Sequence, residues 1–527
     1  MGITIKGGKM KELNLKLKKE IGIFREAGYQ FLNKEISVGE FKSISGGMGV
    51  YAQRGGEKFM IRLRTVSGLI PLKHLKLIES FTEKYNIENL HLTTRQAVQL
   101  HNLSIDEVCD IMEEALDNDL YTRGGGGNFP RNASLSPMSG VEKGEVFDVT
   151  EFAIKTNDYL MENITEYKLP RKLKISFSSG KNDTAKATIN DMGFVAAEKD
   201  GKGYFELYLA GGLGNNPAVS IPYGKEINPK EILYYIEAMI QLFAAEGDYT
   251  NKSRARTRFI PRRMGVNEFL AAFDKHLEVV RKNSNLDIDT EIVLSEIKEK
   301  YNHNLKDTES LKAQRQDGLY TVIVHPMNGQ LKREEFKKIV GFIEKNPKAE
   351  ARLSMEENMY IRNLTEGEAV ELLEMTESFR QKSKIAQSVS CVGVPTCQIG
   401  IEQSQTLVKN IILYLKENTI GGNRLPSVYV SGCQNSCARH QAAELGFAGG
   451  KKKVKDNIED VFDIYAGGEV YVGKTKLGEK LGTMLMREIP YFIGELAEKL
   501  EAAQLDYSDY LQKKNSEFLE LIKKYLV

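Results

Sequence analysis

Apolar and polar positions follow the same order in two stretches of the chain, residues 49–103 and 318–364. Alternating apolar residues predict strands, and apolar residues three and four positions apart predict helices. Each stretch therefore predicts a strand, a turn, a helix and a second strand. A further helix is expected to follow over residues 104–116 in one copy and 366–379 in the other. The pattern indicates that one α+β unit occurs twice.

The repeat continues downstream, where three pairs of segments resemble each other in the same order. Residues 169–177 (LPRKLKISF) match 425–432 (LPSVYVSG), residues 190–197 match 443–450, and residues 207–212 match 463–468. A duplication of this length predicts a fold with pseudo-two-fold symmetry and a ligand shared between the halves. Outside the repeat, helical spacing predicts a helix over residues 10–32 and another over 508–526.

Composition excludes several classes of protein. The 527 residues are too many for one compact core, so two or three domains are expected. A formal net charge of +1 gives no reason to expect bulk attraction to nucleic acid or membrane, so an anion site must be built locally. No apolar stretch has the length of a membrane span, and the first residues lack the pattern of a secretory signal. Because five cysteines are too few for a disulfide scaffold, a cytoplasmic protein is expected.

Four of the five cysteines fall in one segment. Five residues separate Cys391 from Cys397, three separate Cys433 from Cys437, and 35 residues divide the pairs. Four soft thiolates gathered in this way suit zinc or an iron–sulfur cluster. The first gap is wider than in an ordinary zinc knuckle, and the second predicts that Cys433 and Cys437 lie one helical turn apart. The fifth, Cys109, lies on the apolar side of a predicted helix and is expected in the core.

Basic residues alternate with apolar residues in several predicted strands. Lys172 and Lys174 share one face of RKLKISF, and Arg62 and Arg64 share one face of KFMIRLRTV. One basic strand face would be an ordinary solvated surface. Several such faces in a chain of nearly neutral charge predict a cavity that binds a polyanion.

Further polar positions follow the same logic. In LTTRQAVQLH, a single strand is expected to carry Arg95, Gln99 and His101 on one face. The segment RARTRFIPRR adds Arg254, Arg256, Arg258, Arg262 and Arg263. Arg131 follows a glycine-rich loop, GGGGNFP, where backbone can approach a ligand closely.

The two cysteine motifs carry a resemblance to a known family. CVGVPTC followed by SGCQNSC resembles the C-x5-C and C-P-N-x-C signatures of the siroheme-dependent sulfite and nitrite reductases, at their usual separation. Judged by the order of motifs, the resemblance covers about residues 42–500. Gln434 stands where the family commonly has proline, which affects the rigidity of the loop and not the ligands.

The resemblance implies two cofactors and the residues that hold them. A [4Fe–4S] cluster is expected on Cys391, Cys397, Cys433 and Cys437, with the Cys437 thiolate bridging the cluster to the siroheme iron. The siroheme carboxylates need charge-assisted partners. The positions that match the family near siroheme are Arg95, Gln99, Asn132, Arg256 and Arg258. The positions that match the substrate face are Arg62, Arg131, Lys172 and Lys174.

The implied reaction is the six-electron reduction of sulfite to sulfide, with reduction of nitrite to ammonia as the alternative. Lys174 and the tripeptide Pro395-Thr396-Cys397 resemble the assimilatory-type sulfite reductases, because the nitrite enzymes have asparagine in place of the lysine. Sulfite carries more negative charge than nitrite, so a second lysine stabilises it more. The chain lacks a GxGxxG fingerprint and a second cysteine set, so an external donor is expected, a ferredoxin or a flavoprotein.

Two interpretations from other classes stay open at this stage. The four cysteines could close a structural zinc site with no redox chemistry. The arginines could bind phosphates of nucleic acid, which would make binding depend steeply on salt. No CxxxCxxC motif of a radical-SAM enzyme occurs.

The expected architecture is an α+β fold from a pseudo-two-fold duplicated chain. Its expected parts are an N-terminal helical segment (1–41), a ferredoxin-like half-domain (42–116), a siroheme and substrate domain (117–310), a second ferredoxin-like half-domain (311–380), a cluster and siroheme domain (381–505) and a C-terminal helix (506–527). The two half-domains should pair as one unit, and the two related α+β domains should hold the cofactors between them.

Overall fold

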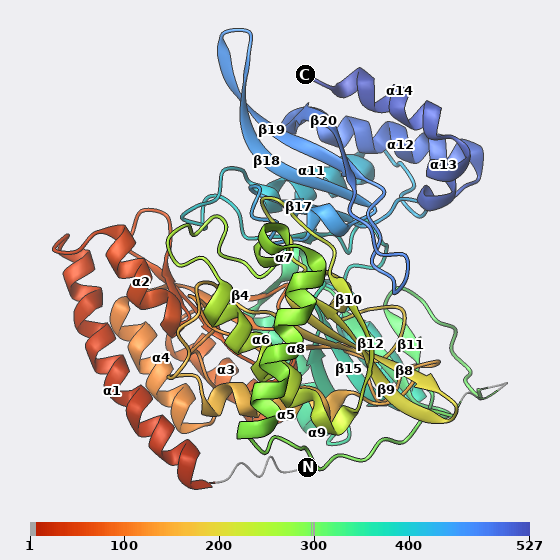
Figure 1. Cartoon of the computed structure of the whole chain (residues 1–527). Helices are drawn as coiled ribbons and strands as arrows, with labels where there is room; N and C mark the ends of the chain where they lie inside the picture. The colour runs from red at the N-terminus through yellow and green to blue at the C-terminus, as the bar shows by residue number, and fades with distance from the viewer. Residues whose placement is uncertain (1–6, 297, 299–300) are drawn as a thin grey trace.

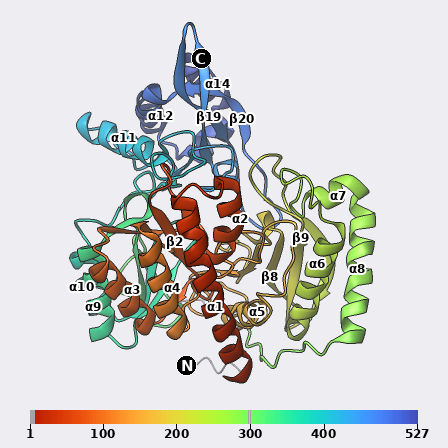
Figure 2. The same cartoon turned by 90° about the vertical axis from the view of Figure 1, so that its left-hand side faces the viewer.

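The computed structural model describes residues 7–296, 298 and 301–527 (Figure 1). Their buried apolar side chains form three separate clusters, the first built from both copies of the repeat and the others from residues 133–288 and 385–522. Figure 2 shows the corresponding three lobes, with the C-terminal lobe above the other two. The α+β class and the duplication predicted from sequence are therefore confirmed.

Two five-stranded sheets form the first lobe, and each takes one strand from the other copy. The first has the order β1-β2-β5-β4-β13 and the second β11-β12-β15-β14-β3. The strands of the first copy are β1 (Val50–Ala52), β2 (Phe59–Leu63), β3 (Leu69–Ile70), β4 (Asn89–Leu92) and β5 (Val98–Leu103). Those of the second copy are β11 (Leu311–Ala313), β12 (Tyr320–Val324), β13 (Gln330–Lys332), β14 (Glu350–Leu353) and β15 (Met359–Leu364). This exchange of β3 and β13 makes the two copies one folding unit.

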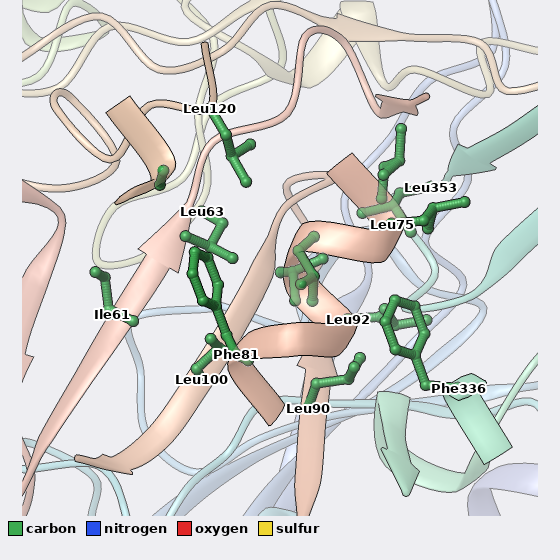
Figure 3. Close-up of a cluster of buried hydrophobic side chains, with 14 of the residues drawn as sticks. Ile61, Leu63, Leu75, Phe81, Leu90, Leu92, Leu100, Leu120, Phe336 and Leu353 are labelled. Atoms are coloured by element: carbon green, nitrogen blue, oxygen red, sulfur yellow. The ribbon is translucent and has the colours of Figure 1, made fainter. Parts of the chain in front are cut away.

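Helices from both copies cover these sheets and complete a shared core. They are α3 (Leu72–Lys84), α4 (Ile105–Asp117), α9 (Arg333–Lys345) and α10 (Glu366–Met375). Ser104 and Thr365 cap α4 and α10 with capping boxes, as the pseudo-symmetry requires. Figure 3 shows Phe336 and Leu353 of the second copy among buried side chains of the first, including Leu75 and Leu92. Cys109 lies fully buried on α4, as predicted.

The second and third lobes repeat one topology. In each sheet the first three strands in chain order are parallel neighbours and the last two join antiparallel. The second lobe has β6 (Ser134–Leu135), β7 (Ile175–Ser178), β8 (Met192–Lys199), β9 (Lys202–Leu209), β10 (Ile221–Ile227), α5 (Thr150–Glu162), α6 (Ile232–Glu246), α7 (Phe259–Met264) and α8 (Val266–Asn283). The third has β16 (Val389–Ser390), β17 (Val428–Ser431), β18 (Leu445–Val454), β19 (Asn457–Ala466), β20 (Glu479–Leu485), α11 (Ser404–Glu417) and α12 (Ile489–Ala503).

The ends of the chain are helical. Helix α1 (Gly7–Leu32) packs against α4, and α2 (Val38–Met48) crosses residue 41, where the sequence predicts a boundary. The single helix predicted over residues 508–526 is wrong, because two helices, α13 (Tyr507–Lys513) and α14 (Asn515–Tyr525), meet at the non-helical residue Lys514. None of the helices in the described ranges is long and apolar enough to cross a membrane.

Three local predictions are also wrong. LTTRQAVQLH is not one strand: Gln96 has φ +52° and turns the chain between β4 and β5, so Arg95 lies in the turn. RARTRFIPRR is not a strand: residues 254–258 form a loop, and residues 259–263 begin α7. Cys433 and Cys437 do not lie on a helix, because their segment is a loop in which Ser436 has φ +54°. In each case residues in the left-handed or turn conformation interrupt the regular element.

The exchanged strand predicts a long-range effect on stability. Leu331 on β13 is fully buried and lies opposite Leu90 on β4 of the other copy. Leu331→Ala should open β4 locally, because removing a buried leucine side chain costs roughly 2–5 kcal/mol. Hydrogen exchange should become at least about tenfold faster at residues 89–92.

The matched control is Leu364→Ala, at an equally buried leucine of β15. It should accelerate exchange in its partner strand, residues 320–324, and leave residues 89–92 as in the unchanged protein. Unchanged exchange at residues 89–92 in Leu331→Ala would contradict the strand exchange.

Candidate functional site

The four clustered cysteines lie on two loops at one edge of the C-terminal sheet. Cys391 directly follows β16, and Cys433 follows β17 after one residue. Because β16 and β17 are parallel neighbours, the loops that leave their carboxyl ends start side by side. The parallel pairing therefore brings together thiols that lie far apart in the sequence.

Hydrogen-bond donors surround two of these sulfur atoms. The Gly432 N–H donates to Cys391 Sγ at 3.2 Å, and Asn435 Nδ2 donates to Cys433 Sγ at 3.4 Å. Burial raises the pKa of Cys391 to about 12 and raises the pKa of Cys397 and Cys433. Thiols in such surroundings become thiolates when a metal takes the proton's place. Donors aimed at sulfur are typical of iron–sulfur sites, where they set the reduction potential.

The spacing of the thiols bears on which metal site they fit. In the described part of the chain, no three His, Cys, Asp or Glu side chains are placed to hold one metal ion. A structural zinc site requires all its ligands at about 2.3 Å from a single ion. Each thiolate of a [4Fe–4S] cluster binds a different iron, so its ligands stand farther apart. The zinc interpretation requires such a group of ligands around one ion, whereas the cluster interpretation does not.

The basic side chains that the sequence predicts to line an anion cavity gather where the first and second lobes meet. They are Arg62, Arg95, Arg131, Lys172, Lys174, Arg256 and Arg258. Among the described residues, the one carboxylate paired with this set is the fully buried Asp191. Asp191 accepts from Arg256 Nε at 3.2 Å and Nη2 at 2.7 Å, and from the Lys174 backbone N–H at 2.9 Å. The positive charge of the cavity is therefore far from neutralised by the protein.

The glycine-rich loop organises two of the arginines through its carbonyls. Arg62 Nη1 donates to Gly125 O at 2.7 Å, and Arg131 Nη2 donates to Gly127 O at 2.9 Å. The loop also donates the Gly127 N–H to Tyr51 Oη at 3.0 Å. Burial would raise the pKa of Tyr51, but the charges of Arg131 and Arg62 and this N–H lower it. The loop thus holds two cations and a phenol at one place.

The two lysines are the most strongly perturbed cations. Burial, together with the charges of Arg256 and Arg131, lowers the pKa of Lys172 to about 7. Burial and the neighbouring Lys172 lower the pKa of Lys174 far below its usual value. An anion in the cavity would relieve both effects, because it compensates charge that water no longer solvates.

The remaining arginines anchor on backbone and keep N–H groups free. Arg95 donates to Asn132 O at 2.9 Å and Ile175 O at 2.8 Å, and Asn132 Nδ2 returns a bond to Arg95 O at 2.9 Å. Arg258 donates to the backbone oxygens of residues 215 and 216. Arg95 Nε and Arg258 Nη1 are buried without a partner in the described residues. Buried unpaired donors on cations are costly, so this set fits a ligand with several carboxylates, such as siroheme.

Contacts between lobes bring the cysteine loops to the cationic cavity. Thr94 Oγ1 in the β4–β5 turn donates to Cys437 O at 2.9 Å. The backbone of Gly214, next to the loop that holds Arg258, exchanges two hydrogen bonds with the Gln441 side chain at 3.0 and 3.1 Å. A thiolate at Cys437 would raise the pKa of Lys172. The basic copy of the duplicated domain therefore faces the cysteine copy.

Sequence reasoning missed Asp191, Tyr51 and Thr94. Asp191 directly follows Asn190 and directly precedes β8, and an acid at the start of a buried strand is the signal that could have found it. Nothing local marks Tyr51 or Thr94, whose roles depend on contacts with residues distant in sequence. Arg254, Arg262 and Arg263 are exposed and do not join the cavity.

Comparison with known proteins supports the same family that the cysteine motifs resemble. A family model described as "Nitrite/Sulfite reductase ferredoxin-like half domain" matches residues 51–118 and 312–378. A second, described as "Nitrite and sulphite reductase 4Fe-4S domain", matches residues 126–280, and together they cover more than half of the chain. The chain belongs to the nitrite and sulfite reductase family. It is an oxidoreductase, and membership confirms the prediction of siroheme and a [4Fe–4S] cluster.

Individual relatives in this family are distant but match over most of their length. A ferredoxin–nitrite reductase of Synechococcus elongatus is 24% identical over 85% of this chain and 87% of its own. A "Sulfite reductase [ferredoxin] 1" of Mycolicibacterium paratuberculosis is 22% identical over 95% of this chain and 89% of its own. The solved structure of the Mycobacterium tuberculosis NirA protein shares the fold, with a TM-score of 0.78, 20% identity and coverage of 96% and 97%.

The 4Fe-4S family model falls on the copy without ligands. Residues 126–280 contain no cysteine, and the four candidate ligands lie in the third lobe, which repeats the topology of the matched domain. The family match therefore identifies the domain type, while the duplication extends it to the part of the chain that carries the thiols.

The cluster assignment can be tested on single cysteines. Cys433→Ala should lose most of its iron and acid-labile sulfide per chain, because one of the four thiolates is removed. Cys109→Ala, in the core of the first lobe, is the matched control and should keep both. Iron and sulfide assays on the purified variants make the comparison, and full retention in Cys433→Ala would refute its role as a ligand.

Proposed function

We propose that this chain reduces sulfite to sulfide by six electrons, with reduction of nitrite to ammonia as the second candidate. The observation that carries the proposal is Lys174, a second lysine two residues from Lys172 in a cavity that already contains Arg62 and Arg131. A doubly charged anion gains more from this extra cation than a singly charged one.

The proposal divides the binding of the anion between guanidinium and ammonium groups. Arg62 and Arg131 have fixed backbone anchors, so they can hold anion oxygens in a set direction and stabilise the charge that develops there. Neither the Lys172 nor the Lys174 ammonium group donates a hydrogen bond to another side chain or carbonyl within the described residues. Both are therefore available to the substrate.

Loss of oxygen from the anion as water requires protons at that oxygen. Lys172, with its pKa near 7, can transfer a proton from Nζ to a substrate oxygen near neutral pH. Bound siroheme and the cluster would supply the metal site and the electrons, one at a time. The residues proposed to hold them are the four cysteines for the cluster, and Arg95, Gln99, Asn132, Arg256, Arg258 and Cys437 for siroheme.

The proposed electron donor is a ferredoxin, the donor named in the relatives from Synechococcus elongatus and Mycolicibacterium paratuberculosis. The loop of Cys397 supports entry of electrons at the surface. Its neighbours Ile399 and Ile401 are 53% and 42% exposed. Exposed apolar side chains beside a cluster ligand give a small carrier a place to approach it closely.

Nitrite is retained as a candidate because relatives named for nitrite and for sulfite match at nearly the same identity, 24% and 22%. A pocket of this kind discriminates between similar anions by few contacts, so one substitution can shift the preference.

The choice of substrate is tested by Lys174→Asn. The ratio of kcat/KM for sulfite to that for nitrite should fall about tenfold, because a charge-assisted contact to the more highly charged anion is lost. Lys168→Asn, at an exposed lysine six residues upstream, should leave the ratio unchanged. A wild-type enzyme that prefers nitrite, with no change in Lys174→Asn, would favour the alternative.

The Lys172 pKa predicts a pH dependence. Lys172 carries its charge below pH about 7 and loses it above, so the KM for nitrite should rise as pH increases through 7. In Lys172→Arg the guanidinium stays protonated, and the KM should vary less over the same range. Nitrite is the probe because its charge is constant there; parallel KM profiles of the two proteins would refute the assignment.

A further inference from the structure

A row of three polar side chains crosses the first sheet from the cationic cavity. Gln99 on β5 lies directly opposite Arg62 on β2 and directly opposite His91 on β4. Gln99 is 4% exposed and His91 is 3% exposed. Because Gln99 and His91 are buried, their hydrogen bonds must be made within the protein.

The donors of Arg62 fix the orientation of the Gln99 amide. Arg62 Nε and Nη2 lie 3.2 and 2.7 Å from one end of that amide, and His91 Nδ1 lies 3.0 Å from the other. A guanidinium has donors only, so the end that faces Arg62 must be the oxygen. The amide nitrogen then donates to His91 Nδ1, which has to be the acceptor.

The tautomer of His91 follows from this direction. With Nδ1 accepting, the neutral imidazole carries its proton on Nε2. That nitrogen lies 3.7 Å from Glu357 Oε1 and has no hydrogen-bond partner among the described residues. Glu357 is 1% exposed, comes from the turn between β14 and β15 in the other copy, and accepts the Ser390 N–H at 3.0 Å through its second oxygen.

We propose that His91 and Glu357 are positioning residues that fix, through Gln99, the direction in which Arg62 offers its N–H groups to the anion. In this arrangement the Nε2–H of His91 faces the Glu357 carboxylate at 3.7 Å, His91 Nδ1 accepts from the Gln99 nitrogen, and the Gln99 oxygen accepts from Arg62. With Nη1 also bonded to Gly125 O, Arg62 keeps one free N–H on each terminal nitrogen. This inference rests on the proposed function in its last step, the binding of the anion.

The network also joins the two copies of the chain. Arg62, Gln99 and His91 belong to the first copy, and Glu357 belongs to the second. Ser390, which donates to Glu357, immediately precedes Cys391. The orientation of a substrate-binding arginine is thereby tied to the segment that begins the cysteine site.

Glu357→Gln reverses the chain of donors with minimal change in shape. The oxygen of the introduced amide would keep the Ser390 N–H, so its NH2 group would face His91 Nε2. His91 would then move its proton to Nδ1, and Gln99 would turn its nitrogen toward Arg62, which cannot accept. Arg62 should shift, and the dissociation constants for sulfite and nitrite should rise about tenfold.

The double variant Glu357→Gln/Gln99→Glu separates direction from packing. A carboxylate at position 99 accepts from both Arg62 and His91 Nδ1–H, so anion binding should return to within about threefold of the wild type. Glu145→Gln, at another buried glutamate that accepts the Gly140 N–H, is the matched control and should bind like the wild type. A merely structural role for Glu357 predicts no rescue by Gln99→Glu.

Two measurements on the holoenzyme decide the proposal. Neutron diffraction from deuterated crystals should show a deuteron on Nε2 and none on Nδ1 of His91, and the reverse in Glu357→Gln with Arg62 displaced. Absorbance titrations with sulfite and nitrite give the dissociation constants. A deuteron on Nδ1 in the wild type, an unmoved Arg62 in Glu357→Gln, or a double variant that binds no more tightly than Glu357→Gln would overturn it. A wild type that binds neither anion would refute the proposed function, while the neutron maps still decide the positioning of Arg62.

Discussion

Positive charge is gathered around one cavity with little inside the protein to balance it. Arg95, Arg131 and Arg258 donate their hydrogen bonds to backbone or neutral groups. Among the residues that the structure describes, the ion pair of Asp191 with Arg256 is the one that balances a charge of this set. Desolvated cations without partners destabilise a fold, and the lowered pKa values of the two lysines show the cost. A ligand with several carboxylates, together with a small oxyanion, resolves this imbalance. The glycine-rich loop and the contacts between lobes hold these cations beside the cysteine segment.

Duplication with exchange of strands explains how such a cavity comes to face a cluster site. Each half-domain sheet contains one strand of the other copy, so the two copies cannot separate, and the domains that follow them are held facing each other. The two copies carry different functional groups: the first carries the cations and the second carries the thiols. Turns at equivalent positions, at Gln96 and Glu357, have also diverged and now reach different partners.

The sequence predicts the fold class, the repeat and the grouping of site residues well, because hydrophobic periodicity and motif spacing are local. It fails where single residues take left-handed conformations, as at Gln96 and Ser436, which turn a predicted strand and a predicted helix into loops. It also misses residues whose function arises from contacts across the lobes. Thr94 bonds Cys437 across 343 positions, and His91 of the first copy lies 3.7 Å from Glu357 of the second. A single amino-acid sequence contains no pattern that identifies such pairs.

We propose that the basic side chains and the four cysteines hold siroheme and a [4Fe–4S] cluster as one redox centre. The most direct test is a visible absorption spectrum of the purified protein, with iron and acid-labile sulfide assayed on the same sample. We expect a strong band in the red region from the macrocycle, together with iron and sulfide. A colourless protein that contains zinc and no sulfide would contradict it.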